Sequence, residues 1–216
     1  MKAYHIFLLR HGLTQANSDG RYIGRTDMPL CAQGENKLRE LAATYDYPRA
    51  DAFFSSPLKR CTQTLGILYP DAKPITVRGL SECDFGDFEG KTITELSDDP
   101  AYRDWIAKNG MSTPPHGESA QDFQKRCCFA FEQIVGTLMK EGQSRAVIMA
   151  HGGTIMFVLG SYGYPKRPFF EWLAGNGTGY EIVLTPSLWM SARAFEVVGR
   201  VPEGIPEGGH DGGGVR

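Results

Sequence analysis

The sequence predicts a single-domain α/β fold of three layers, α/β/α, around a largely parallel central sheet. Short apolar runs alternate along the chain with helix-like segments, and this alternation is typical of parallel sheets covered by helices. With 216 residues, the chain is long enough for one large domain with a substantial core. Two of the apolar runs end in His-Gly, at His11 and His151. Because parallel strands end at one edge of a sheet, where such folds bind ligands, we expect the two imidazoles to lie together.

From the N-terminus, strand and helix signals follow one another. The apolar run Tyr4–Leu9 predicts a buried strand, and Gly34–Tyr45 predicts a helix because its apolar residues recur on one face. A second, short strand is expected at Ala52–Ser55. The next helix should begin at once, with Ser56 as its N-cap and Pro57 at its first position.

The middle of the chain predicts mainly loops and helices. A third short strand is expected at Pro74–Val77, and a glycine-punctuated loop at Gly79–Gly90. Short helices follow as far as Ala107, and the paired prolines of Asn109–Gly117 predict another loop. A long helix, Ser119–Lys140, comes next, because its first residue and the aspartate three positions later resemble a capping box.

The C-terminal part of the chain predicts three more strands. A strand at Arg145–Ala150 leads through the second His-Gly turn into a helix at Gly153–Leu159. Two further strands, Tyr180–Leu184 and Ala192–Val198, are expected to form a hairpin joined at Pro186–Ser187.

The composition argues against several classes of partner. A net charge of −2 gives no support for a nucleic-acid or membrane partner, and no apolar run approaches membrane-spanning length. The 5 cysteines form no CxxC pair, which favours a reducing compartment, and the first apolar run is too short for a signal peptide. We therefore expect a cytoplasmic protein with one domain over residues 1–201 and a Gly- and Pro-rich tail over residues 202–216. The sequence leaves the oligomeric state open.

Two histidines, two arginines and a carboxylate are candidates for a site that acts on a small phosphate ester. One imidazole of the pair would attack phosphorus. Arg10 precedes the first histidine. Arg60 lies in the first turn of its helix, where side chains point back toward the helix N-terminus and the helix dipole favours a bound anion. These cations would hold the phosphoryl oxygens. Glu82, in the glycine-punctuated loop, would protonate the leaving group.

Each candidate also has an ordinary structural role open to it. Arg60 fits a solvated surface arginine, and from spacing alone Glu82 is favoured as part of a solvated acidic loop. Thr14 and Asn17 either donate hydrogen bonds to phosphate or cap the next segment. The glycines that begin at Gly152 either offer amides to an anion or relieve crowding where strand becomes helix. Two His-Gly turns after two apolar strands are much harder to attribute to chance.

Other phosphate chemistries lack their motifs. No cysteine is followed at the sixth position by arginine, as cysteine phosphatases require, and neither D-x-D nor H-E-x-x-H occurs. The segment Gly86–Thr92 resembles a phosphate-binding P-loop but has three residues between its glycines instead of four, and it follows no apolar strand. We therefore expect an enzyme that uses no metal and no other cofactor.

Several segments together resemble the histidine phosphatase superfamily, which includes the cofactor-dependent phosphoglycerate mutases. The resemblance extends at least from Tyr4 to Val183 and predicts a phosphoglycerate mutase-like fold. The first motif reads Leu-Arg-His-Gly-x-Thr-x-x-Asn, and the later ones follow in the family's order. The matching segments are Leu9–Asn17, Gly24–Gly34, Ser55–Thr64, Leu80–Gly90 and His151–Gly153.

The resemblance assigns a role to each candidate. It implies that His11 is the nucleophile and becomes phosphohistidine, and that Glu82 is the proton donor. It also implies that Arg10, Arg60 and His151 bind the phosphoryl group. Asn17 would line the phosphate pocket.

Two departures from the mutase pattern favour a phosphatase. Ala16 stands where mutases usually have tryptophan, and Cys83 and Asp84 stand where they have arginine and histidine after the acid. The motifs are more similar to those of α-ribazole phosphatases and broad-specificity phosphatases. We therefore expect a phosphomonoesterase, with a phosphoglycerate mutase as the alternative enzyme, for which Arg21 and Arg25 would supply part of the missing charge. A protein that only binds a phosphoryl ligand is the non-enzyme alternative, but binding alone needs no nucleophile or acid.

Overall fold

The strands of the computed structural model, which describes residues 2–205, form one seven-stranded sheet in the order β3-β2-β4-β1-β6-β7-β5. Its first four strands run parallel, β6 runs antiparallel to both β1 and β7, and β5 pairs parallel with β7. The sheet is therefore largely parallel, as the sequence predicts. The strands are β1 Tyr4–Arg10, β2 Ala52–Ser55, β3 Ile75–Thr76, β4 Arg145–Ala150, β5 Gly163–Tyr164, β6 Gly179–Leu184 and β7 Phe195–Val201.

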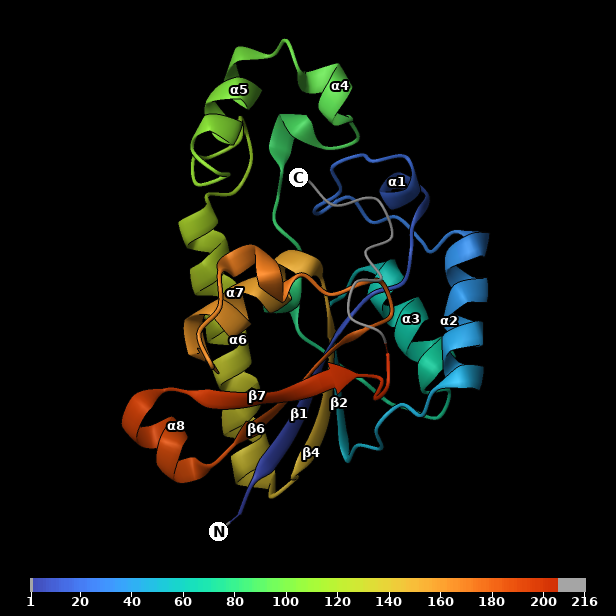
Figure 1. The fold of residues 1–216 in the computed structure, drawn as a ribbon, viewed down its shortest axis with the longest axis vertical. Coiled ribbons are helices and arrows are strands. Elements are labelled where there is room, and N and C mark those ends of the chain that lie inside the picture. The colour runs from blue at the N-terminus through green and yellow to red at the C-terminus, as the bar shows by residue number, and fades with distance from the viewer. Residues whose placement is uncertain (1, 206–216) are drawn as a thin grey trace.

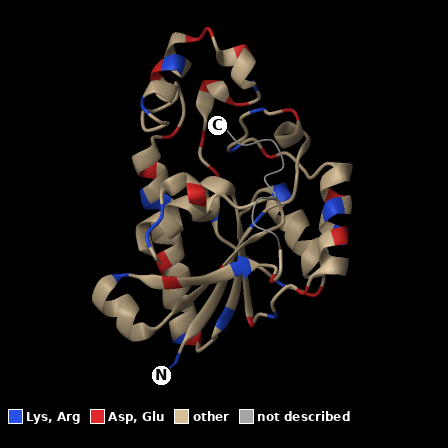
Figure 2. Cartoon of the chain, in the orientation of Figure 1, with Lys and Arg blue, Asp and Glu red and all other residues tan. Residues whose placement is uncertain are grey.

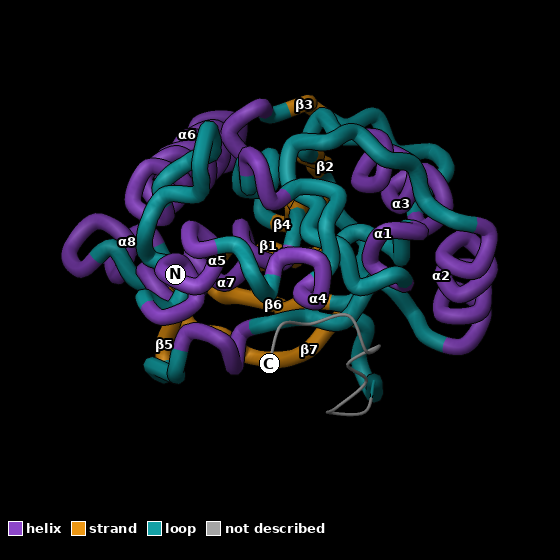
Figure 3. The backbone as a smooth tube through the Cα atoms, turned by 90° about the horizontal axis from the view of Figure 1, so that it is seen from above, coloured by secondary structure: helices purple, strands orange, loops and turns teal. Residues whose placement is uncertain are grey.

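Helices cover both faces of this sheet. Helices α2 and α3 lie on one side, and α6 and α7 lie on the other, as the two perpendicular views agree (Figures 1 and 3). Within the described residues, no helix is long and apolar enough to cross a membrane. The helices are α1 Gln15–Ser18, α2 Ala32–Thr44, α3 Lys59–Leu68, α4 Ile93–Leu96, α5 Pro100–Ala107, α6 Ala120–Glu141, α7 Gly152–Tyr162 and α8 Pro186–Ala192. Short 3₁₀ turns lie at Arg78–Leu80, Gly86–Phe88 and Phe169–Trp172.

The central strands are apolar at consecutive positions because both of their faces are buried. Ile6 and Leu8 of β1 point into the core shared with α6 and α7. Phe7 and Leu9 of the same strand point into the second core, under α2 and α3. All four side chains are at most 1% exposed, so the strands that carry the site are held from both sides.

Two predictions about local structure are wrong. Helix α3 begins at Lys59, with Leu58 and not Ser56 as its N-cap, because the Ser56 hydroxyl instead contacts His151 at 2.8 Å. Strands β6 and β7 do pair antiparallel, but α8 joins them in place of a tight turn. The Thr185 side chain accepts a hydrogen bond from the Leu188 amide and so starts that helix. Of the predicted tail, residues 206–216 lie outside the described residues.

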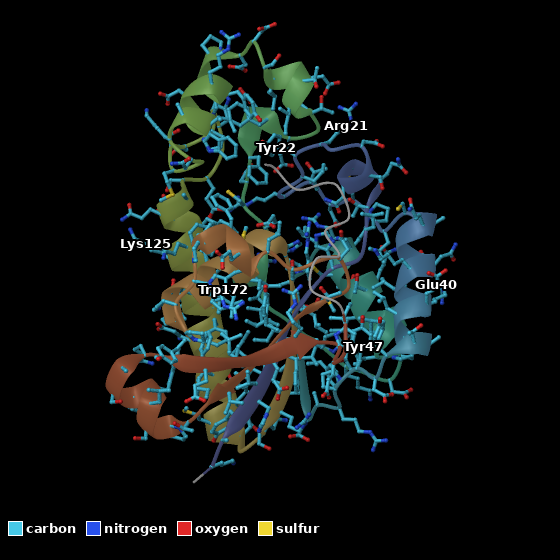
Figure 4. All side chains as sticks on the ribbon, viewed as in Figure 1. Arg21, Tyr22, Glu40, Tyr47, Lys125 and Trp172 are labelled. Carbon is cyan, nitrogen blue, oxygen red and sulfur yellow. The ribbon has the colours of Figure 1, made fainter. Side chains whose placement is uncertain are left out.

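A small cap lies beyond the carboxyl ends of β1, β2 and β4 and contains α4 and α5 (Figure 1). Its core is a group of aromatic rings, in which the hydroxyls of Tyr22 and Tyr102 are 2.9 Å apart. Tyr22 comes from the N-terminal part of the chain, so it ties that segment to the cap (Figure 4). Charged residues of both signs lie on the cap and on the outer helices (Figure 2). The cap therefore stands over the strand ends at which the candidate residues gather.

Candidate functional site

Strand register brings the two predicted histidines together. Arg10 of β1 pairs with Ala150 of β4, so His11 and His151 leave the sheet at the same level. Their ring centroids are 5.1 Å apart, with the ring planes at 62°. Both are buried, at 5% and 0% exposure. The structure thus places the two imidazoles side by side at one edge of the sheet, as the two His-Gly turns predict.

The His11 ring is held in one tautomer. Its Nδ1 lies 2.7 Å from the Gly12 carbonyl oxygen, which can only accept, so Nδ1 carries the proton and Nε2 keeps its lone pair. Burial, followed by the charges of Arg60 and Arg10, lowers the pKa of His11 well below its usual 6.5. A neutral imidazole with a free Nε2 lone pair is the form that a nucleophile requires.

The main chain around His11 is fixed by partners on other elements. The Gly12 amide donates to the Thr64 hydroxyl of α3 at 2.8 Å, and the Asn176 side-chain amide donates to the His11 carbonyl at 2.9 Å. A β-carbon at residue 12 would lie 2.6 Å from a Leu38 methyl group. The glycine after the histidine is therefore needed for the close approach of α2.

His151 has a polar contact at each ring nitrogen. Arg60 Nε donates to its Nδ1 at 3.3 Å, so the proton of the neutral ring lies on Nε2, which donates to the Ser56 hydroxyl at 2.8 Å. Burial, then the charge of Arg60, then that of His11, lowers the pKa of His151 well below 6.5. Ser56 therefore orients His151, a role that was not predicted because the sequence pattern indicates a helix cap at Ser56.

Arg60 is the second residue of α3 and is only 1% exposed. Its terminal nitrogens donate to the carbonyls of Thr26 at 2.9 Å and Gly24 at 2.6 Å. With Nε donating to His151, three of the five guanidinium N–H groups have acceptors among the described residues. One N–H on each terminal nitrogen remains for a bound anion.

Glu89 fixes the loop that supplies those carbonyls. Its carboxylate accepts hydrogen bonds from the amides of Arg25 at 2.8 Å and Thr26 at 2.9 Å, and also from the Thr26 hydroxyl. The loop packs so closely that a β-carbon at Gly24 would lie 1.7 Å from the Cys83 carbonyl oxygen. Gly24 and Glu89 both lie in segments that match the family motifs, Gly24–Gly34 and Leu80–Gly90, but spacing alone does not indicate that Glu89 binds this loop.

Arg10 ends β1 directly beside the histidine pair. Its Nη1 donates to the Ala174 carbonyl oxygen at 2.7 Å, which directs the guanidinium toward the segment before β6. A β-carbon at Gly152 would lie 3.6 Å from Arg10 Nε, so the guanidinium passes close to the start of α7. Arg10 and Arg60 therefore place positive charge near the histidines, and both lower the pKa of His11.

Glu82 is buried, at 9% exposure, and is not part of a solvated loop. Its carboxylate accepts hydrogen bonds from the amides of Cys83 at 3.0 Å and Gly153 at 3.2 Å. Burial raises the pKa of Glu82 above its usual 4.5, although these two amides and the nearby arginines act in the opposite direction. A carboxyl group with a raised pKa keeps its proton to higher pH than a solvated glutamate does, which suits it to donate that proton to a leaving group.

The three remaining predicted residues lie at helix starts. The Thr14 hydroxyl accepts from the Asn17 amide at 3.2 Å, while the Thr14 amide donates to Asn17 Oδ1 at 3.2 Å, so the two residues form a capping box on α1. Capping, one of the two alternatives that the sequence leaves open, is therefore observed. Gly152 is the first residue of α7, where helix amides are free to bind an anion.

No group of three or more His, Cys, Asp or Glu side chains among residues 2–205 is arranged to hold a metal ion. The candidate site instead combines two imidazoles, two guanidinium groups and a buried carboxyl group. Such a set can accept a phosphoryl group on nitrogen, bind its oxygens and supply a proton.

Comparison with known proteins identifies the family. The family model of the histidine phosphatase superfamily (branch 1) matches residues 6–193, and the chain belongs to that superfamily. The adenosylcobalamin/α-ribazole phosphatase of Escherichia coli is 26% identical over 178 residues, which cover 80% of this chain and 86% of the relative. A broad-specificity phosphatase of Saccharomyces cerevisiae is 32% identical over 164 residues, covering 71% and 68% of the two chains. A 2,3-bisphosphoglycerate-dependent phosphoglycerate mutase of Gloeobacter violaceus is 30% identical over 164 residues, covering 71% and 73%.

Solved structures share the fold. The α-ribazole phosphatase of Shigella flexneri superposes with a TM-score of 0.75 at 24% identity, over 90% of this chain and 94% of the other. A phosphoglycerate mutase of Bacillus anthracis superposes with a TM-score of 0.76 at 20% identity, over 91% and 92%. The phosphoglycerate mutase-like fold is therefore as predicted, and it is common to phosphatases and mutases.

Proposed function

We propose that the protein is a phosphomonoesterase that hydrolyses a small phosphorylated metabolite through a phosphohistidine on His11. The observation that carries the proposal is the tautomer of His11, whose Nδ1 donates to the Gly12 carbonyl at 2.7 Å and leaves the Nε2 lone pair free. The lowered pKa of the same imidazole supports this role, because only the neutral ring is nucleophilic.

The reaction has two in-line steps. In the first, Nε2 of His11 forms a bond to phosphorus while the bond to the ester oxygen breaks, and Glu82 gives its proton to the departing alkoxide. Arg10 and Arg60 hold the equatorial oxygens, joined by His151 once its Nε2–H turns from the Ser56 hydroxyl to the phosphoryl group, with the Asn17 side-chain amide and the Gly152 amide as further candidate donors. Thr14 donates its hydroxyl and its amide to Asn17 Oδ1 and so orients Asn17. Preorganised charges of this kind supply most of the catalysis in phosphoryl transfer.

The second step releases inorganic phosphate. The Glu82 carboxylate takes a proton from a water molecule, whose oxygen attacks phosphorus as the bond to His11 breaks. The glutamic acid and the neutral imidazole are then restored. No step requires a metal ion or another cofactor, so we propose that activity is metal-independent.

Mutase activity is the alternative, and the contacts of two arginines argue against it. A mutase must hold a second phosphate, for which Arg21 and Arg25 are the candidate cations. Arg25 lies 3.4 Å from the Asp84 carboxylate and 3.8 Å from that of Glu118. Arg21 pairs with Glu95 at 2.8 Å and donates to the Gly90 carbonyl. Both cations therefore already have acidic partners, which supports the phosphatase.

One assay separates the two enzymes. The protein is incubated with 2- or 3-phosphoglycerate and with a panel of other phosphomonoesters, with and without bisphosphoglycerate and with and without EDTA. We expect release of inorganic phosphate from at least one monoester in EDTA without bisphosphoglycerate, and negligible interconversion of the phosphoglycerates. Isomerisation that bisphosphoglycerate accelerates well beyond phosphate release would establish the mutase instead.

A further inference from the structure

Arg126 of α6 is a charged residue that the proposed reaction does not use directly, and it binds the main chain that carries Glu82. Its Nη1 donates to the carbonyl oxygens of Gly79 at 3.0 Å and Ser81 at 2.9 Å. Its Nη2 donates to the Glu82 carbonyl at 3.3 Å. One guanidinium group thus holds three carbonyls within a four-residue segment that ends at the proton donor.

Glu118 fixes the guanidinium itself. Its carboxylate accepts from Arg126 Nε at 2.9 Å and from Nη2 at 2.7 Å, and its side chain is only 11% exposed. This two-point geometry holds the planar guanidinium in a single orientation. The Glu118 amide also donates to the Asp84 carbonyl at 2.8 Å, so the chain is tied down on both sides of Glu82.

The Glu82 carboxylate depends on this backbone for its position. One of its two hydrogen bonds comes from the amide of the next residue, Cys83, and the other comes from Gly153. Helix α6 also supports Gly153, because a β-carbon there would lie 2.8 Å from the Phe123 ring. That ring is covered by the Arg126 guanidinium at 5.1 Å. Arg126 therefore contacts both the main chain that carries Glu82 and the Phe123 ring that packs against Gly153.

We propose that Arg126 is a positioning residue for the proton donor, which rests on the function proposed for Glu82. It holds the segment Gly79–Glu82 so that the carboxyl group stays between the Cys83 and Gly153 amides, beside the histidines. A displacement of about 1 Å in a catalytic group can cost roughly 10²-fold in rate. Loss of Arg126 should therefore slow the step in which Glu82 protonates the leaving group and leave substrate binding largely unchanged.

The first test measures the loop without relying on activity. Amide hydrogen exchange is compared in the wild type, Arg126→Met and the control Lys125→Met, which removes a charge from the neighbouring, exposed position on α6 (Figure 4). In Arg126→Met we expect faster exchange at Cys83 and Gly153 and unchanged exchange in α2. Lys125→Met should match the wild type throughout. Unchanged protection of the Cys83 amide in Arg126→Met would overturn the proposal.

The second test uses leaving groups. Arg126→Met should lower kcat for an alkyl phosphate by about 10²-fold, with little change in KM, and should lower kcat for p-nitrophenyl phosphate far less, because that leaving group needs little protonation. Combined with Glu82→Gln, it should cause no further loss, since a residue that acts through Glu82 has nothing left to position. Equal losses on both substrates, or additive losses in the double variant, would contradict the proposal.

Two further controls separate the possible failures. If Arg126→Met does not fold, Arg126→Lys keeps the charge but loses the planar fork, and the same exchange and kinetic differences are expected to a smaller degree. A wild type that hydrolyses no phosphomonoester would refute the proposed function, whereas the exchange measurement would still decide whether Arg126 holds the loop.

Discussion

The amide nitrogen of Gly153 lies 3.2 Å from one carboxylate oxygen of Glu82, and a β-carbon at residue 153 would lie 2.5 Å from the other. The first turn of α7 thus supplies a donor to the buried acid at a distance that no side chain at this position allows. The same β-carbon would lie 2.8 Å from the Phe123 ring, so neither neighbour leaves room for it.

Gly153→Ala should therefore displace Glu82. We expect kcat for alkyl phosphates to fall by about 10²-fold, because the proton donor moves by the order of 1 Å. The matched control is Gly160→Ala in the same helix, where the nearest atom to an added β-carbon is 3.7 Å away, an ordinary contact. Gly160→Ala should keep full activity and equal or exceed the wild-type Tm, since alanine favours helix. A Gly153→Ala variant as active as Gly160→Ala would show that Glu82 does not require this close packing.

Glu82→Gln tests the proton donor itself. The amide cannot give up a proton as the carboxylic acid does, so hydrolysis of alkyl phosphates should fall by about 10²–10⁴-fold, the usual range for general acid–base catalysis. The loss on p-nitrophenyl phosphate should be much smaller. Steady-state kinetics on both substrates measure the ratio, and a ratio equal to that of the wild type would point to a binding or structural role.

The pKa directions of the two proposed catalytic groups predict how the rate depends on pH. Burial and the two arginines lower the pKa of His11 below 6.5, so its active, neutral form persists as the pH falls. Burial raises the pKa of Glu82 above 4.5, so its active, protonated form persists as the pH rises from acid. For alkyl phosphates, kcat/KM should therefore decline as the pH rises through the pKa of Glu82 and as it falls through that of His11.

The control for this profile is Glu82→Gln. Its kcat/KM should no longer decline as the pH rises through the pKa of Glu82, whereas any pH dependence that comes from ionisation of the substrate should remain. A wild-type rate that increases steadily toward alkaline pH would contradict the assignment of Glu82 as the acid.

The meeting of His11 and His151 was predictable because it follows from the order of local signals. Each histidine comes directly after an apolar strand, and parallel strands bring their carboxyl ends to one edge. The pairing of Arg10 with Ala150 is the register that this reasoning requires. Arg60 also lies near the start of its helix, as expected, although that helix begins later than Ser56 predicts.

Burial of the charged residues was not predictable from local pattern. Spacing favours a solvated Glu82, and the family resemblance outweighs that interpretation by implying that Glu82 is the proton donor. The partners of buried Glu82 include residues far away in sequence, namely Gly153, whose amide donates to its carboxylate, and Arg126 of α6, which donates to its main-chain carbonyl. Ser56 illustrates the opposite error, because a strong local signal for a helix cap is overridden by a hydrogen bond to His151. Local sequence therefore predicts where the strands end, whereas contacts between residues distant in sequence determine the burial and the hydrogen-bond partners of the site residues.

Identification of the phosphorylated residue tests the central claim most directly. The protein is mixed with an active phosphomonoester, quenched rapidly at alkaline pH and mapped by mass spectrometry, with His11→Ala as the control. We predict a phosphoryl group on His11 that is labile in acid and stable in base, and we predict that the control, although folded, shows neither adduct nor turnover. A phosphoryl group on His151 or on a cysteine, or hydrolysis that continues in His11→Ala, would contradict the account.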